Sequence, residues 1–317
     1  MRIGYFLSSE EHPPQVLVEQ ARRAERAGFE ALWISDHYHP WNDAQGQAPF
    51  VWSVIGAISQ VCSLPVTTAV TCPTVRIHPA VVAQAAATAA VQLEGRFVLG
   101  VGSGEALNEH VLGDAWPNAS TRLEMLEEAV GVMRRLWTED GFVDHRGTHY
   151  RVENARLYTR PEEPPPVYVS AFGPKAMEVA LRIGDGFVTT SPDADAVRAW
   201  RERSRTRGPA QVGYKVCYAP DRESAVDEAH RLWANSGVPG ELSQVLPSPR
   251  HVEQVSQLVT REMTASSVTC GPDVEAHVAE LAKHADAGFD EVYVSNMGSD
   301  WDGFFRLYAE EVLPRVR

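Results

Sequence analysis

Eight short apolar segments alternate with amphipathic segments along the chain, and this alternation predicts a closed (β/α)8 barrel, the TIM barrel. The apolar segments are rich in Val, Ile and aromatic residues on both faces, which is typical of parallel strands that helices cover. They span residues 2–6, 31–35, 66–71, 97–102, 167–171, 186–189, 212–218 and 291–295. Eight such units close most simply into a barrel, and a doubly wound open sheet is the alternative.

The segments between the strands predict helices and a repeated unit. Residues 15–27 and 123–136 place apolar side chains at steps of three and four, which gives each helix one apolar face. Residues 27–35 (AGFEALWIS) are similar to residues 287–295 (AGFDEVYVS). Each copy is consistent with a helix end, a glycine stop and a buried strand, as expected of a fold built from repeated units.

Two segments depart from the plain repeat. Residues 142–152, with Arg146-Gly147 at their centre, predict a small hairpin. Residues 238–264 form an irregular, proline-containing stretch before a helical pattern. Both are long enough to be insertions over the mouth of the barrel. We expect residues 1–317 to form one domain with insertions at the C-terminal face of the barrel.

Composition narrows the class of partner and the compartment. A formal net charge of −13 argues against nucleic acid and anionic membranes as partners. The four cysteines show no CxxC spacing, which favours a reduced, cytoplasmic setting. The chain enters a strand pattern directly, so we expect no signal peptide, and no apolar run reaches the roughly 20 residues that span a bilayer. The 11 histidines lack the spacing of a metal site, so we expect no metal.

A glycine-rich turn follows the strand at 97–102. Gly100, Gly102 and Gly104 let the backbone approach a bound ring or phosphate, although their spacing is not that of the dinucleotide fingerprint. Glu105 and Asn108 come next, and a carboxylate just past a strand end is where a barrel enzyme places an acid. The alternative for Glu105 is an acid at a helix start, favoured by the helix dipole.

Two further strand ends carry candidate residues. Asp36 and His37 follow the strand at 31–35, and a histidine has an unperturbed pKa of about 6.5, suited to a general base. A capping aspartate beside a solvent-facing histidine is the alternative. Trp41 provides an aromatic surface for a flat ligand, and the alternative is that it only packs against neighbouring side chains. After the strand at 167–171, Gly173 and Pro174 open a helix whose free N–H groups suit phosphate, unless this is an ordinary turn.

Taken together, these residues resemble the luciferase-like flavin and deazaflavin oxidoreductases. More narrowly, they are similar to the branch that contains the F420-dependent glucose-6-phosphate dehydrogenases. The motifs that carry the resemblance over nearly the whole chain are Ser35-Asp36-His37 with Pro40-Trp41, Ala48-Pro49-Phe50, Cys72-Pro73-Thr74 with His78-Pro79-Ala80, residues 102–109 (GSGEALNE), Ala115-Trp116-Pro117, Phe172-Gly173-Pro174 and Gly184-Asp185-Gly186-Phe187.

The resemblance implies a barrel that binds coenzyme F420 at its C-terminal face. It makes His37 the base that takes a hydroxyl proton as hydride leaves the carbinol carbon for C5 of the ring. Glu105 would manage the proton at N1 or stabilise charge there, Trp41 would pack beside the ring, and Glu10 matches a further acid of the pocket. The family is also dimeric, which implies a homodimer.

The resemblance also implies a set of cofactor-binding residues. Phe172, Gly173 and Pro174 would hold the cofactor phosphate through backbone donors, and the bond between Ala69 and Val70 would be a cis peptide. The full set is Asp36, Ala69, Val70, Cys72, Ser103, Gly104, Asn108, Ala171, Phe172, Gly173 and Pro174.

The sequence departs from the branch where basic residues bind the sugar phosphate. Asp193 stands where a lysine is expected, and the other basic positions, aligned near Ser243 and Ala265, are uncharged. Arg250, Arg261 and Lys215 are the basic residues that other segments offer instead.

The sequence therefore predicts an F420-dependent oxidoreductase acting on an alcohol/carbonyl pair other than glucose 6-phosphate. The alternatives are an FMN-dependent luciferase-like monooxygenase and a non-catalytic flavin-binding protein.

Overall fold

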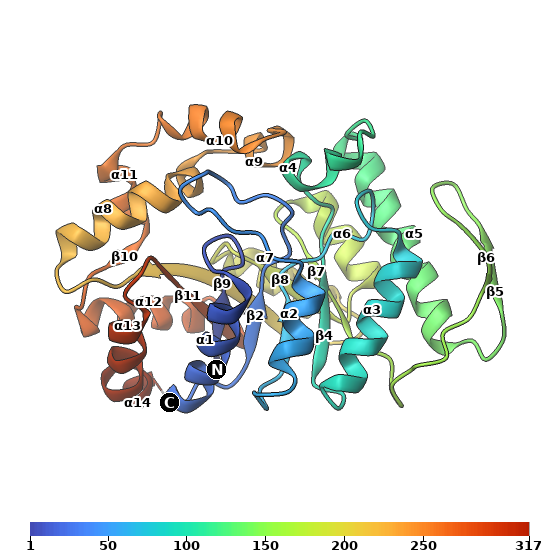
Figure 1. The fold of residues 1–317 in the computed structure, drawn as a ribbon, viewed down its shortest axis with the longest axis horizontal. Coiled ribbons are helices and arrows are strands. Elements are labelled where there is room, and N and C mark those ends of the chain that lie inside the picture. Colours follow the sequence, from blue (N-terminus) through green and yellow to red (C-terminus); the bar gives the residue numbers. More distant parts are fainter. Residues whose placement is uncertain (317) are drawn as a thin grey trace.

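The computed structural model describes residues 1–316 and confirms the closed parallel barrel (Figure 1). Strand β8 pairs with β9, β9 with β11 and β11 with β1, so the sheet returns to its beginning. The barrel strands are β1 (Arg2–Leu7), β2 (Leu32–Ile34), β3 (Val66–Thr68), β4 (Phe97–Val101), β7 (Val167–Ser170), β8 (Gly186–Thr189), β9 (Ala210–Cys217) and β11 (Glu291–Met297). A short further strand, β10 (Thr269–Cys270), pairs with the C-terminal end of β9.

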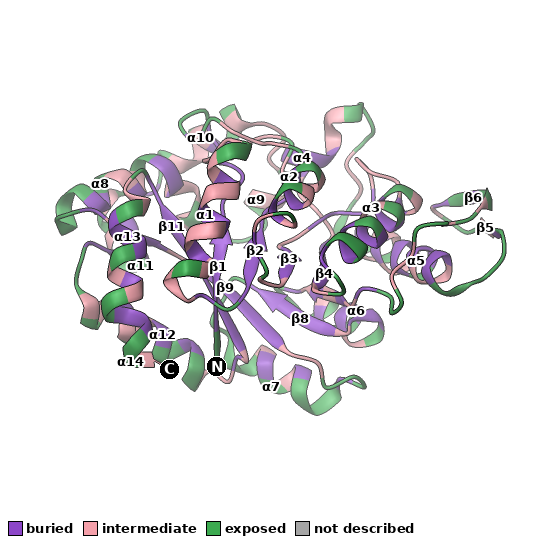
Figure 2. Cartoon of the chain, turned by 60° about the horizontal axis from the view of Figure 1, so that its bottom comes forward, coloured by how far each residue is buried: buried purple, intermediate pink, exposed green. Residues whose placement is uncertain are grey.

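Helices surround the sheet, as Figure 2 shows by the buried strands inside and the exposed helix faces outside. They are α1 (Pro14–Ala27), α2 (Val51–Ile58), α3 (Pro79–Gln92), α4 (Ala106–Glu109), α5 (Ala119–Thr138), α6 (Pro174–Ile183), α7 (Ala194–Arg203), α8 (Arg222–Trp233), α9 (Leu242–Val245), α10 (Pro249–Ser256), α11 (Arg261–Ser267), α12 (Val274–Asp286), α13 (Trp301–Leu307) and α14 (Leu313–Val316). None of the helices within residues 1–316 combines the length and apolarity of a membrane span.

The barrel interior is closed by packed side chains near the N-terminal ends of the strands. The rings of Trp33 and Tyr293 stack with centroids 4.5 Å apart. Gln211 accepts a hydrogen bond from Trp33 Nε1 at 3.0 Å and donates one to Glu291 at 2.8 Å. This layer leaves the C-terminal ends of the strands as the open side of the barrel, where barrel enzymes carry their sites.

The predicted hairpin is present, but it does not cover the mouth of the barrel. Its strands β5 (Val143–Arg146) and β6 (Arg151–Ala155) pair in antiparallel fashion. Figure 1 shows the hairpin beside α5, outside the ring of strands. Glu128 of α5 accepts hydrogen bonds from the backbone N–H groups of His149 and Tyr150, which holds the hairpin there. The expectation of an insertion over the mouth was therefore wrong for this segment.

The other insertion does lie at the C-terminal ends of the strands. Helices α9 and α10 lie at the top of Figure 1, next to α4. Trp116 Nε1 donates to the carbonyl of Gln244, and the N–H of Asp43 donates to the carboxylate of Glu253. Residues 238–264 thus contact the loops that follow β2 and α4.

Candidate active site

The C-terminal ends of β1 and β2 bring an acid and a base together. Glu10 Oε1 lies 3.3 Å from His37 Nε2. The other oxygen of Glu10 accepts hydrogen bonds from Ser35 at 2.6 Å and Ser8 at 3.1 Å. Burial raises the pKa of Glu10, but the charge at His37, the Ser35 hydrogen bond and the charge of Lys215 outweigh it and hold the pKa below its usual value. Glu10 is therefore a fixed carboxylate beside the imidazole.

The second nitrogen of His37 has two partners of opposite kind. Nδ1 lies 3.2 Å from the carbonyl oxygen of His39 and 3.0 Å from Nδ2 of Asn108. Oδ1 of Asn108 accepts from the N–H groups of Tyr38 and His39, so the amide nitrogen must face the imidazole. The Trp41 ring lies 5.2 Å from the imidazole and closes its other side.

Glu105 joins this group from the end of β4. It occupies the position before the first residue of α4, but its carboxylate makes no capping hydrogen bond to that helix. Instead, Oε2 accepts from Asn108 Nδ2 at 3.3 Å. Asn108 thus links His37 to Glu105, and the structure brings together the acid, the base and the amide that the sequence singled out.

A buried ionic network beneath these residues was missed by the sequence analysis. The guanidinium of Arg76 donates a hydrogen bond to Asp36 at 2.9 Å, and the backbone N–H of Arg76 donates one to Glu109 at 2.8 Å. Thr71 donates to the other oxygen of Asp36 at 2.8 Å. Burial raises the pKa of Glu109 to about 7, aided by the charges of Asp36 and Glu105 and opposed by Arg76. Arg76 thus connects the loops after β2, β3 and β4.

Replacing Arg76 by methionine should destabilise the fold strongly. The substitution leaves two buried carboxyl groups, Asp36 and Glu109, without their counter-charge, and breaking such a buried network costs about 3–5 kcal/mol. Urea denaturation of both proteins measures the loss. The matched control is Arg182→Met, which breaks an exposed pair with Glu127 and should cost less than about 1 kcal/mol. Equal losses in the two variants would show that the network carries no special stability.

The strand ends also provide a close-packed backbone surface. The peptide bond between Ala69 and Val70 is cis, as the resemblance implied. A Cβ atom at Gly102 would come within 2.7 Å of the Val70 side chain, and one at Gly104 within 2.6 Å of Cys72 Sγ. Gly104 also has a φ of +80°, which side-chain-bearing residues rarely adopt. Ser103 lies between them, partly exposed.

The turn after β7 offers backbone donors. Ala171 is buried, whereas Phe172 and Gly173 are exposed. Pro174 is the first residue of α6, and open space lies where a Cβ of Gly173 would stand. Backbone N–H groups in the first turn of a helix have no intrahelical acceptor, so this turn is suited to an anionic group.

The positions expected to be basic in the sugar-phosphate branch, and the basic residue Arg261, take different places: Ser243 lines a small hollow with Trp41, whereas the others make contacts of their own. Asp193 caps α7, because its carboxylate accepts from two N–H groups of the first helical turn. Arg261 pairs with Asp227 and Glu223. The backbone carbonyl of Ala265 accepts from Arg222, and Ala265 packs against the cluster beside α8.

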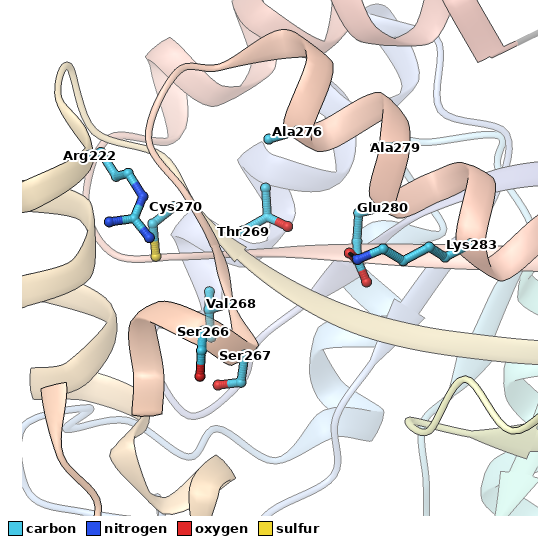
Figure 3. A pocket seen from close by; sticks show the side chains of 10 residues that line it. All are labelled: Arg222, Ser266, Ser267, Val268, Thr269, Cys270, Ala276, Ala279, Glu280 and Lys283. Atoms are coloured by element: carbon cyan, nitrogen blue, oxygen red, sulfur yellow. Dashed lines mark hydrogen bonds and ion pairs between the residues drawn. The ribbon is translucent and has the colours of Figure 1, made fainter. Parts of the chain in front are cut away.

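A hollow of about 300 Å³ lies among α8, α11, β10 and α12, and neither Glu10 nor His37 lines it. Figure 3 shows its lining, in which the Lys283 ammonium points toward Glu280, its ion-pair partner. The Arg222 guanidinium donates to a backbone carbonyl there. The charged groups of this hollow thus already have partners within the chain.

Comparison with known proteins gives three findings. The model of the luciferase-like monooxygenase family matches residues 1–301. The chain is 36% identical over 330 positions to the F420-dependent glucose-6-phosphate dehydrogenase of Microbacterium testaceum, covering 100% of this chain and 98% of that protein. It superposes with a TM-score of 0.92 and 31% identity on an F420-dependent secondary alcohol dehydrogenase solved with an F420-acetone adduct, covering 100% and 99% of the two chains.

A more distant solved structure shares the fold. The monooxygenase RslO1 of Streptomyces bottropensis superposes with a TM-score of 0.75 at 18% identity, and the match covers 100% of both chains.

Proposed function

Because the chain belongs to the luciferase-like monooxygenase family, we propose that it is a coenzyme F420-dependent oxidoreductase that moves a hydride between the deazaflavin and an alcohol or carbonyl substrate. Relatives at 36% and 31% identity are F420-dependent dehydrogenases. The observation that carries the proposal is the Glu10–His37 pair, joined through Asn108 to Glu105 at the open end of the barrel.

The residues at the strand ends fit the cofactor. Gly102 and Gly104 let the turn after β4 pack directly on Val70 and Cys72, so backbone rather than side chains borders the partly exposed Ser103. The first turn of α6 after Gly173 suits the cofactor phosphate. Both oxygens of Asp36 are engaged by Thr71 and Arg76, so the cofactor contact proposed for Asp36 would be shared with that network.

The carbonyl of His39 beside Nδ1 lets one imidazole serve both directions of the reaction. When Nδ1–H donates to the His39 carbonyl, Nε2 carries a lone pair and can accept the hydroxyl proton of an alcohol. Accepting that proton gives the imidazolium, and in the reverse direction the imidazolium returns its Nε2 proton to the carbonyl oxygen of the substrate. Coenzyme F420 supplies the ring carbon that accepts or releases the hydride.

The neighbouring residues support this proton transfer. Glu10 lies beside Nε2 and stabilises the positive charge that forms when His37 accepts a proton. Trp41 shields the imidazole from one side. We assign Glu105, held by Asn108, to the proton or charge at the ring nitrogen of the cofactor.

Cofactor binding tests the proposal directly. Titration of the protein with F420 and with FMN, followed by cofactor fluorescence, should give a Kd for F420 in the micromolar range or tighter, about −8 kcal/mol. Tight binding of FMN without binding of F420 would favour a monooxygenase instead. The homodimer and the cytoplasmic location rest on the resemblance and the cysteine pattern, and they stay predictions.

A further inference from the structure

Lys215 is a cation inside the barrel that the proposed chemistry leaves unused. It lies in β9 two residues after Gly213, against which the Trp33 ring packs, so its side chain faces the interior of the barrel. Within residues 1–316, its ammonium has no hydrogen bond and no ion pair. It lies 4.0 Å from the centroid of the Trp233 ring and 5.5 Å from that of Phe6.

The Lys215 ammonium has N–H donors that no acceptor in residues 1–316 satisfies. It carries three N–H donors, and aromatic faces attract the charge without accepting a conventional hydrogen bond. Burial lowers the pKa of Lys215, while the charges of Glu10 and Glu11 oppose that shift. Leaving such donors unpaired is costly, so an oxygen atom of a ligand would be bound favourably here.

The position of this cation relates it to the reacting group. Lys215 lies on the Trp233 ring, and Trp233 belongs to the cluster on which Trp41 packs. The Trp41 ring in turn lies 5.2 Å, centroid to centroid, from the imidazole of His37, so Lys215 and His37 are separated by these two tryptophans. A substrate whose reacting oxygen meets His37 and which extends toward Trp233 would bring a second oxygen to Lys215.

The charges around this position favour a neutral oxygen over a carboxylate. Glu10 is a fixed carboxylate, and Glu11, which accepts hydrogen bonds from Trp233 and from the N–H of Gly298, is a second acid nearby. Burial raises the pKa of Glu11 to about 7. A substrate carboxylate would meet like charge, whereas a hydroxyl can accept from Lys215 without that repulsion.

We propose that Lys215 determines specificity by binding a second, uncharged oxygen of the substrate, so that the substrate is a polyhydroxy alcohol or the matching hydroxycarbonyl compound. This inference rests on the proposed function. It goes further in assigning the chemistry next to the reacting carbon.

Three alcohols that differ in one substituent test the proposal. They are 2-propanol, 1,2-propanediol and lactate, which carry a methyl, a hydroxymethyl and a carboxylate group beside the same secondary carbinol. With the F420-loaded protein, kcat/KM should be at least about tenfold higher for 1,2-propanediol than for 2-propanol, because one hydrogen bond to a charged donor is worth about 1.5–3 kcal/mol. Lactate should be the poorer of the two oxygenated substrates.

Variants connect this preference to Lys215. Lys215→Met should reduce the ratio of the kcat/KM values for the diol and 2-propanol to near one, and Lys215→Arg should retain part of it. The control Lys283→Met changes an exposed lysine that pairs with Glu280, and it should keep the wild-type ratio. F420 binding by each variant shows that it is folded.

The outcomes separate this inference from the proposed function. A protein that fails to bind F420 overturns the proposed function. A protein that binds F420 overturns the role of Lys215 if the diol gives no advantage, if lactate is preferred, or if Lys215→Met keeps the wild-type ratio. If none of the three alcohols is turned over, their effect on the fluorescence of bound F420 replaces kcat/KM, and the absence of any effect also overturns the role.

Discussion

Replacing His37 by alanine should lower turnover by about 10²–10⁴ while F420 still binds. The His37 imidazole has the Glu10 carboxylate beside Nε2, and it has the His39 carbonyl and the Asn108 amide beside Nδ1. Its loss removes the proton acceptor but leaves the glycine surface after β4 and the helix start after β7 in place. The effect should therefore appear in kcat far more than in the dissociation constant of the cofactor.

Steady-state rates with a substrate that the wild-type protein oxidises, together with F420 titration of the variant, measure the two quantities separately. His251→Ala is a suitable control, since His251 is exposed and its side chain hydrogen-bonds to the neighbouring Ser248. If the His37→Ala protein stays active, His37 is not the proton acceptor, and the alternative of a histidine beside a capping aspartate holds.

Glucose 6-phosphate should be a very poor substrate, although the 36% identical relative from Microbacterium testaceum is named a glucose-6-phosphate dehydrogenase. A phosphate is held by charged hydrogen bonds, each worth about 1.5–3 kcal/mol, so the loss of two or three weakens it by several orders of magnitude. Asp193 presents a carboxylate in the place of a lysine, and Arg261 is already paired with Asp227 and Glu223. The Lys215 side chain faces the barrel interior and lies against the Trp233 ring, 4.0 Å from its centroid.

A comparison of kcat/KM for glucose 6-phosphate and for uncharged alcohols tests this exclusion. Asp193→Lys should raise kcat/KM for the sugar phosphate relative to the wild-type protein. Asp193→Asn keeps a side chain suited to capping α7 and separates the effect of charge from that of the cap. Efficient oxidation of glucose 6-phosphate by the unchanged protein would show that the alignment of the Asp193 loop was wrong.

The barrel strands were predictable because a parallel strand covered by helices must be apolar on both faces, and eight such segments stand out in the sequence. The strand β10 was not predictable, because its two residues are too few to show a strand pattern in the sequence. The place of the hairpin depends on Glu128 of α5, which binds the backbone of residues 149–150. A contact between a helix and a hairpin turn leaves no pattern in either segment.

The site was predictable to the extent that it lies at strand ends. Glu10, His37 and Glu105 each follow a buried strand, and closure of a parallel barrel brings such positions together. Arg76 and Glu109 were missed because each is a single charged residue in a loop or short helix, where charged residues are usually exposed. Lys215 lay within the predicted strand 212–218, but that its side chain faces the barrel interior became clear only from the packing of Trp33 against Gly213, two residues earlier.

Closure of the barrel also constrains how the chain can reach its native state. The first strand, β1, pairs with the last, β11, so Arg2 aligns with Glu291 nearly the whole chain away. Contacts of such long sequence separation slow folding, since a large loop must be ordered before they form. During synthesis the open edge of β1 must wait until almost the entire polypeptide has emerged. A chain truncated before β11 would leave the edges of β1 and β9 without partners, a hazard for aggregation.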